Sequence, residues 1–146
     1  MHEPMEAAIL HAKFLAKHLN RCSSQYIVRI ALKETSLPSS HDGFQFALHT
    51  VNMLQENPFG KLKHGIYLAV GLLRDPPAGQ DAVEQCIRSC IRTGWMTRNV
   101  QLWEYYFPEG CPGNKECPSN RDYLMGIVDF IELWKCCCEE VRYESV

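Results

Sequence analysis

Apolar residues recur at helical spacing in residues 80–97, and polar residues fill the opposite side. One stripe of the predicted helix is apolar: Val83, Ile87, Ile91 and Trp95. The other side carries four polar side chains that project together: Gln85, Arg88, Ser89 and Arg92. Asp81 stands at an N-cap position, and Gly94 followed by residues 97–99 predicts the end. We therefore expect one face to pack on the protein and the other to meet a partner.

The same spacing predicts helices along the rest of the chain. They cover about residues 4–20, 24–37, 42–57, 62–73 and 99–107, and a last helix begins near 120. The segment RDPPAG at 74–79 holds two prolines and a glycine, which predicts a turn between two of these helices. No alternating run is long enough to predict a sheet. We expect an all-α, single compact domain of about six to seven helices with a central helix-turn-helix.

Length and composition agree with one folded domain. A chain of 146 residues, 46% of them hydrophobic, is long enough to build a core. The longest apolar run, residues 65–73, is about half the length that crosses a bilayer. The first ten residues carry no basic run before an apolar stretch, so we expect no secretory signal and no membrane partner. The eight cysteines are then expected to be free thiols in a cytoplasmic protein.

The charge is unevenly distributed, although the formal net charge is only -2. Residues 61–98 hold six basic and three acidic side chains, whereas residues 99–146 hold four basic and nine acidic ones. A local positive excess favours an anionic partner for the helix at 80–97. Four basic residues flank this helix and its turn and are candidates for phosphate contacts: Lys61, Lys63, Arg74 and Arg98.

Three segments together resemble the C-terminal DNA-binding domain of the master response regulator that initiates endospore formation in Firmicutes. They are LPSSHDGFQF at 37–46, AVEQCIRSCIRTGW at 82–95 followed by Asn99, and CPSNRDYLMGIVDF at 117–130. The resemblance spans about residues 25–135. It implies a six-helix fold with a helix-turn-helix at its centre, double-stranded DNA as the partner, and binding as a homodimer on repeated sites.

The resemblance divides the chain into three parts. Residues 1–22 form an additional helix packed on the domain, residues 23–135 form the regulator-like domain, and the acidic end at 136–146 is expected to fray. We expect a stand-alone relative without a phosphoacceptor receiver domain. On the outer face of helix 80–97 the family is richer in basic and histidine residues, so Ala82, Gln85 and Ser89 look like replacements. Arg88 is retained, and Arg92 is a basic residue gained.

The leading functional hypothesis is a transcription regulator that inserts helix 80–97 into the major groove. Arginine bound to guanine and glutamine bound to adenine are side-chain pairings that read a base sequence. The predicted base-reading residues are Gln85, Arg88, Ser89 and Arg92. The alternative is a protein-interaction module, such as an antagonist of a related regulator, that keeps the fold and has lost DNA reading.

Other chemistries have weaker support in the sequence. No nucleophile elbow, phosphate-binding glycine loop or metalloprotease pair is present, so we expect no enzyme, no cofactor and no small-molecule substrate. His11, His18 and Cys22 recur at a similar helical angle, which leaves metal-dependent folding as a further alternative. Cys111 and Cys117 match neither a zinc nor a redox spacing. The clustered aromatic residues are expected to pack in the core.

Overall fold

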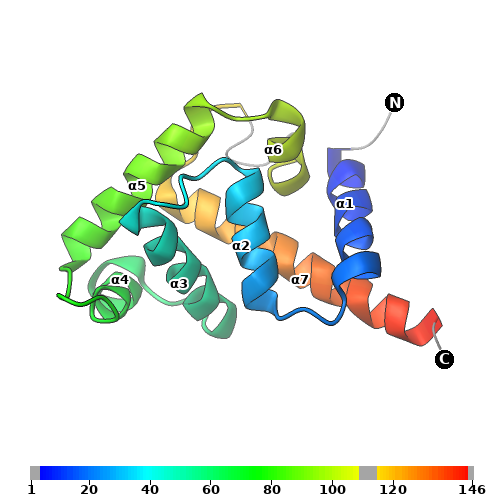
Figure 1. The fold of residues 1–146 in the computed structure, drawn as a ribbon, viewed down its shortest axis with the longest axis horizontal. Helices are drawn as coiled ribbons and strands as arrows, with labels where there is room; N and C mark the ends of the chain where they lie inside the picture. Colours follow the sequence, from blue (N-terminus) through cyan, green and yellow to red (C-terminus); the bar gives the residue numbers. More distant parts are fainter. Residues whose placement is uncertain (1–3, 109–114, 145–146) are drawn as a thin grey trace.

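The computed structural model describes residues 4–108 and 115–144. Helices joined by turns and loops are the only regular secondary structure in this part of the chain (Figure 1). It contains seven α-helices, one short π-helical segment and no strand. The α-helices are α1 Pro4–Leu19, α2 Ser24–Glu34, α3 Asp42–Glu56, α4 Tyr67–Gly71, α5 Gln80–Met96, α6 Val100–Tyr106 and α7 Asn120–Glu144, and the π-helical segment η1 spans Leu62–Ile66. The predicted all-α class is confirmed.

Side-chain caps begin several helices where the sequence predicts them. Ser23 caps α2 by accepting a hydrogen bond from the Tyr26 amide at 3.2 Å. Asn99 caps α6 in the same way, accepting from the Leu102 amide at 3.1 Å. The Ser119 hydroxyl accepts from the Asp122 amide at 3.1 Å and begins α7. Each cap satisfies an amide that has no partner inside its helix.

Three predicted boundaries are wrong. Asp81 is not an N-cap, because Gly79 holds that position and Asp81 lies in the first turn of α5. The helix α2 ends at Glu34 instead of near residue 37, and Ser36 then adopts a left-handed backbone with φ 67°. The helix expected over 62–73 is interrupted at its start. Lys63 is extended there, with ψ 140°, and His64 is left-handed, with φ 63°.

Helix α7 is the central element of the fold. It packs against α1, α2, α3, α5 and α6. Figure 1 shows it running behind α2. The hydrophobic core is continuous and draws on every helix. Of the aromatic residues predicted to pack in the core, Trp103, Tyr106, Phe107 and Trp134 are buried, whereas Trp95 and Tyr105 are only partly buried. A single core places α5 on the same rigid support as the other helices.

The described C-terminal residues belong to α7. The helix continues to Glu144, and Cys137 and Cys138 are buried. Fraying of residues 136–146 stays a prediction. The additional helix α1 packs mainly on α7. Composition alone had made this acidic segment look solvent-exposed, whereas one stripe of it is covered.

Candidate nucleic-acid interface

The outer face of α5 carries all four predicted base-reading residues. Gln85, Arg88, Ser89 and Arg92 are exposed. The inner face is buried, and its members are Val83, Ile87, Cys90, Ile91 and Gly94. Successive turns of one helix therefore present two arginines, a glutamine and a serine to the outside on a backbone that is anchored from within.

Close helix contacts hold α5 in place. Gly43 of α3 lies directly against the Cys86 carbonyl, so a Cβ at this position would overlap the backbone of α5. At the other end of α5, a Cβ on Gly94 would lie 2.6 Å from the Thr35 carbonyl oxygen. Both glycines are present because the neighbouring backbone leaves no room for a side chain. These contacts determine which face of α5 points outward.

The short helix α4 and the turn before α5 complete a helix-turn-helix layout. The Ala78 amide donates to the Gly71 carbonyl at 2.9 Å and closes the turn over 72–77. The His64 amide donates to Gln80 Oε1 at 2.8 Å, and Gln80 Nε2 donates to His64 Nδ1 at 3.0 Å. This pair ties the first residue of α5 to the left-handed residue before α4. The start of α5 is thereby held against the segment that precedes α4.

Helix α7 supports the same unit from the other side. Asn120 is buried, and its side-chain amide donates to the Tyr67 hydroxyl at 3.3 Å and to the Glu84 carbonyl at 3.1 Å. One side chain thus connects the start of α7 to both α4 and α5. Burial raises the pKa of Tyr67, and the hydrogen bond from Asn120 lowers it in part. Tyr67 is therefore a neutral hydroxyl at ordinary pH.

Arg88 and Arg92 line a groove between α5 and the segment that leads into α7. The groove has a volume of about 450 Å³, and its other lining residues are Glu116, Cys117, Pro118, Ser119 and Asp122. Burial raises the pKa of the Cys117 thiol, and the charges of Arg92 and Arg98 oppose this increase. The groove mixes two cations with two carboxylates, so its electrostatic character is not purely positive.

The four predicted phosphate-binding residues do not form one cluster. Lys61 is exposed at the start of η1, whereas Lys63 pairs with Asp81 at 3.7 Å. Arg74, in the turn, pairs with Asp42 at 3.1 Å. Arg98 lies beyond the other end of α5. It donates to the Trp95 carbonyl at 2.7 Å, and its guanidinium carbon is 3.6 Å from the centre of the Trp95 ring.

A second polar cluster lies away from α5, and the sequence reasoning did not identify it. His11 of α1 contacts Glu34 of α2 at 2.8 Å, and the Tyr106 hydroxyl of α6 donates to the same carboxylate oxygen. His11 also stacks on Tyr105 with ring centres 4.2 Å apart. No local spacing could reveal this cluster, because its members are up to 95 residues apart in the chain.

The metal alternative receives no geometric support from this cluster. Among the described residues, no three histidine, cysteine or acidic side chains lie close enough to hold a metal ion. His11 contacts Glu34 instead of the other predicted ligands, and Cys22 is a partly buried free thiol. Cys111 lies outside the described residues.

Two further findings concern the whole chain. No helix in the described residues is long and apolar enough to cross a membrane. The chain matches none of the protein families with which it was compared, and no curated protein sequence matches it either.

Proposed function

We propose that this protein binds double-stranded DNA by inserting α5 into the major groove. The observation that carries the proposal is the set of exposed side chains on the outer face of α5, presented next to α4 across the connection at residues 72–79. The 17 residues of α5 span about 25 Å. A helix of this kind enters the major groove, which is about 12 Å wide. The second helix of a helix-turn-helix contacts bases mainly with its N-terminal residues. Gln85 lies in the N-terminal half of α5 and Arg88 at its middle, whereas Ser89 and Arg92 lie in the C-terminal half.

The roles of the side chains follow from their hydrogen-bonding groups. Arg88 and Arg92 offer the two-pronged donor set that pairs with guanine, and Gln85 offers the donor and acceptor that pair with adenine. Ser89 lies between the arginines on the same face and has a hydroxyl that suits either a base or a phosphate. These four residues are the proposed reading surface.

The flanking cations would set the position of the helix on the DNA backbone. Lys61, Lys63 and Arg74 lie near the start of α5, and Arg98 lies beyond its end. To bind DNA, Lys63 must leave the carboxylate of Asp81 and Arg74 that of Asp42, and each must pair with a phosphate instead. Both ion pairs are exposed, and such pairs contribute only about 0–1 kcal/mol, so the exchange costs little.

The resemblance described above extends the proposal to biology. It would make this protein a cytoplasmic transcription regulator related to the DNA-binding domain of the sporulation-initiating response regulator. A homodimer on repeated sites is the assembly that such a domain would use. The outer face of α5 is compatible with this use, because its four reading residues are exposed.

A salt series tests the proposal directly. We would measure binding of the protein to a pool of random duplexes by fluorescence anisotropy, from low to physiological salt. Affinity should fall steeply as salt rises, and the double variant Arg88→Ala with Arg92→Ala should bind at least about ten-fold more weakly. In a plot of the logarithm of the binding constant against the logarithm of the salt concentration, each phosphate contact that a variant removes should reduce the magnitude of the slope by about 0.9.

The matched control removes two positive charges elsewhere. Lys17 and Arg21 are exposed near the end of α1. Figure 1 shows α1 on the opposite side of the fold from α5. The variant Lys17→Ala with Arg21→Ala should therefore bind nearly as well as the wild type. Absence of binding to any duplex at low salt, or equal loss in both double variants, would rule out α5 as the reading helix.

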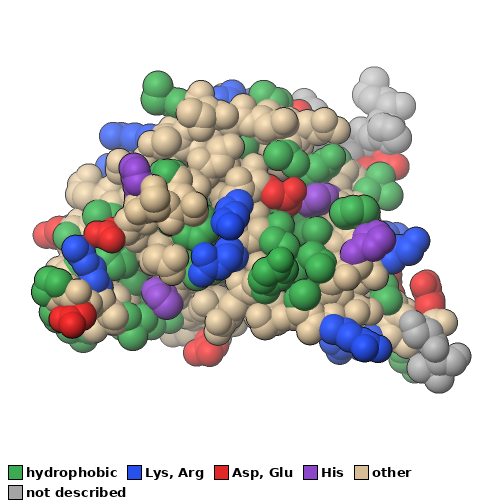
Figure 2. Space-filling view, viewed as in Figure 1, with side chains coloured by type: hydrophobic (Ala, Val, Ile, Leu, Met, Phe, Trp, Pro, Cys, Tyr) green, Lys and Arg blue, Asp and Glu red, His purple; other side chains and the backbone are tan. Residues whose placement is uncertain are grey.

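The second candidate function is a protein-interaction module on the same fold. It is favoured by Glu116 and Asp122, which line the groove beside Arg88 and Arg92. On the face in Figure 2, Lys and Arg side chains lie interspersed with Asp and Glu side chains. A mixed surface of this kind fits a protein partner with its own mixed charges. This function would be favoured by two results together: the protein binds a partner protein, and it binds no DNA in the salt series.

A further inference from the structure

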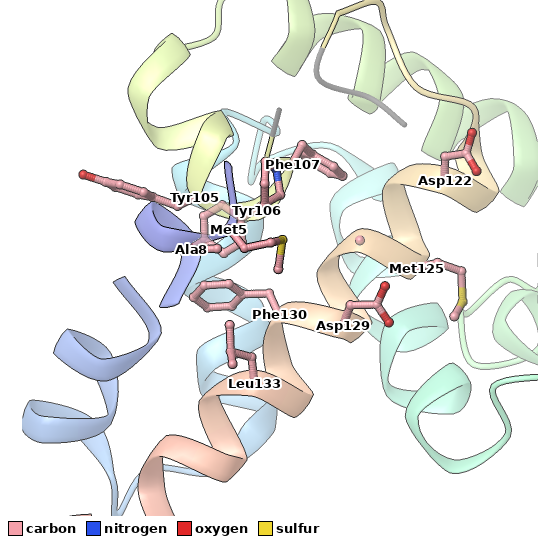
Figure 3. Close-up of a pocket in the computed structure, with 12 residues that line it drawn as sticks. Met5, Ala8, Tyr105, Tyr106, Phe107, Asp122, Met125, Asp129, Phe130 and Leu133 are labelled. Carbon is pink, nitrogen blue, oxygen red and sulfur yellow. The ribbon is translucent and has the colours of Figure 1, made fainter. Parts of the chain in front are cut away.

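An apolar hollow of about 290 Å³ lies between α1, the end of α6 and α7, and it shares Asp122 with the groove beside Arg88 and Arg92. Figure 3 shows Met5 of α1, Phe107 after α6, and Phe130 of α7 around it. Leu133 extends the apolar wall along α7. The hollow is therefore formed where three separate elements meet, and its walls are mainly hydrocarbon and aromatic.

The wall on the α6 side is firmly packed. Phe107 is buried and lies 5.0 Å from the ring centre of Trp103 and 5.4 Å from that of Tyr123. A Cβ on Gly126 would overlap the Phe107 ring, so this glycine allows the ring to lie against α7. Phe107 is therefore packed on both sides, and it forms one wall of the hollow. Met5 closes the outer side and is 46% exposed.

The charged groups at this hollow are acidic. Of the described residues that line it, Asp122 and Asp129 are the ionisable acids, and none is a lysine or arginine. Partial burial raises the pKa of Asp129, and the negative charge of Glu132 raises it further. Lys135 pairs with Glu132 at 3.3 Å, and no described residue forms an ion pair with Asp129. A positive charge placed beside Asp129 would therefore be stabilised.

We propose that this hollow binds a small organic cation that carries an ammonium group on one aromatic ring or short alkyl body. The volume of the hollow is near the lower end of the range for small-molecule sites, about 300–1,000 Å³. The apolar body would contact Met5, Phe130 and Leu133, and the ammonium group would lie beside Asp129 at the rim. Aromatic walls add favourable contacts with a cation. This proposal is independent of the proposed DNA binding.

The test uses 2-phenylethylammonium as the probe. It would be titrated into the isotope-labelled protein, and amide shifts of residues 5–8 and 125–133 would be followed by nuclear magnetic resonance. We expect saturable shifts in these two segments. The neutral isostere 2-phenylethanol should bind about three-fold to five-fold more weakly, because an exposed ion pair contributes a modest part of the affinity.

Three variants distinguish the contribution of the Asp129 carboxylate from that of the apolar wall. Asp129→Asn should bring the affinity for the amine down to that for the alcohol. Met5→Ala should weaken both probes by similar factors, because it removes apolar wall without changing charge. Glu139→Gln removes one exposed acidic charge further along α7 and should change neither affinity. Absence of saturable shifts, or equal binding of the two probes to the wild type, would overturn the proposal.

Discussion

Thr35 shows how single residues join distant helices in this protein. Its hydroxyl donates to the Ala31 carbonyl at 2.8 Å and lies 2.7 Å from the Tyr123 hydroxyl, 88 residues away. Its carbonyl accepts from Trp103 Nε1 at 3.0 Å. Buried polar atoms must find partners, and here the end of α2, α6 and α7 satisfy one another. The identities of these residues give no indication that they meet, because the pairing depends on the tertiary arrangement.

Glu34 leads to the first prediction at the residue scale. Burial alone would raise the pKa of its carboxyl, but hydrogen bonds from His11 and Tyr106 and the His11 charge lower it below its ordinary value. A lowered pKa in the folded state means that the ionised carboxylate stabilises the fold. This contribution is present above the unfolded pKa of about 4.3 and is lost as pH falls through the folded value.

We therefore expect Glu34→Gln to destabilise the protein at pH 7 by about 1–2 kcal/mol. The difference from the wild type should shrink between about pH 5 and pH 3, as the wild-type carboxylate becomes protonated. Urea unfolding across this range measures both effects. Glu56→Gln, at the exposed end of α3, is the control and should change stability little. A pH-independent difference for Glu34→Gln would contradict the ion-pair explanation.

At the scale of elements, boundaries that depend on local chemistry could be predicted and the others could not. The helix α3 matches its predicted range because Asp42 and Gly43 start it and Pro58 prevents its continuation. The helix predicted to begin at residue 62 was wrong at its start. Its apolar spacing is helical, yet Lys63 and His64 leave the helical region. The reason is the long-range pair with Gln80, which no window of neighbouring residues contains.

In the candidate interface, too, some features could be predicted from the sequence and others could not. The exposure of Gln85 and Arg92 follows from helical periodicity once the apolar stripe is known. The partners of Lys63 and Arg74 do not follow, because Asp81 and Asp42 reach them only through the turn and the packing of α3. Sequence reasoning therefore predicts which side chains are outside, but it does not predict which of them are already paired.

The pair between His64 and Gln80 gives a prediction for the helix-turn-helix. Gln80→Ala removes two hydrogen bonds that hold a left-handed histidine, and this conformation is unfavourable without support. We expect the variant to lose about 0.5–1.5 kcal/mol of stability. Amide hydrogen exchange at His64 should accelerate up to about ten-fold, which corresponds to about 1.4 kcal/mol.

Gln85→Ala on the outer face of α5 is the matched control, because it changes the same residue type in the same helix without touching His64. It should leave stability and exchange unchanged. The double variant His64→Gly with Gln80→Ala should recover part of the loss, because glycine adopts a left-handed backbone without strain. Unchanged exchange at His64 in Gln80→Ala would show that the turn is held by packing alone.

At the scale of the whole molecule, α1 belongs to the core of the domain. Its buried face packs against α7, and His11 stacks on Tyr105 of α6. Cys137 of α7 is 4% exposed, and burial raises the pKa of its thiol, while the charge of Lys13 in α1 opposes this increase in part. In Figure 1, α1 and the C-terminal part of α7 lie side by side. Residues 23–135 therefore pack against a helix that lies outside this range.

Removing residues 1–22 tests how much this packing contributes to stability. We expect the shortened protein to melt at least ~10 °C lower, because α7 would expose an apolar stripe that now contacts α1. Cys137 should then react with a thiol reagent at a rate near that of Cys136, which is exposed in the intact protein and serves as the internal reference. Circular dichroism would report whether helix content falls as well. A shortened protein with the original melting temperature and a protected Cys137 would mean that residues 23–135 and the rest of α7 are stable without α1, and that α1 is an attachment to a complete domain.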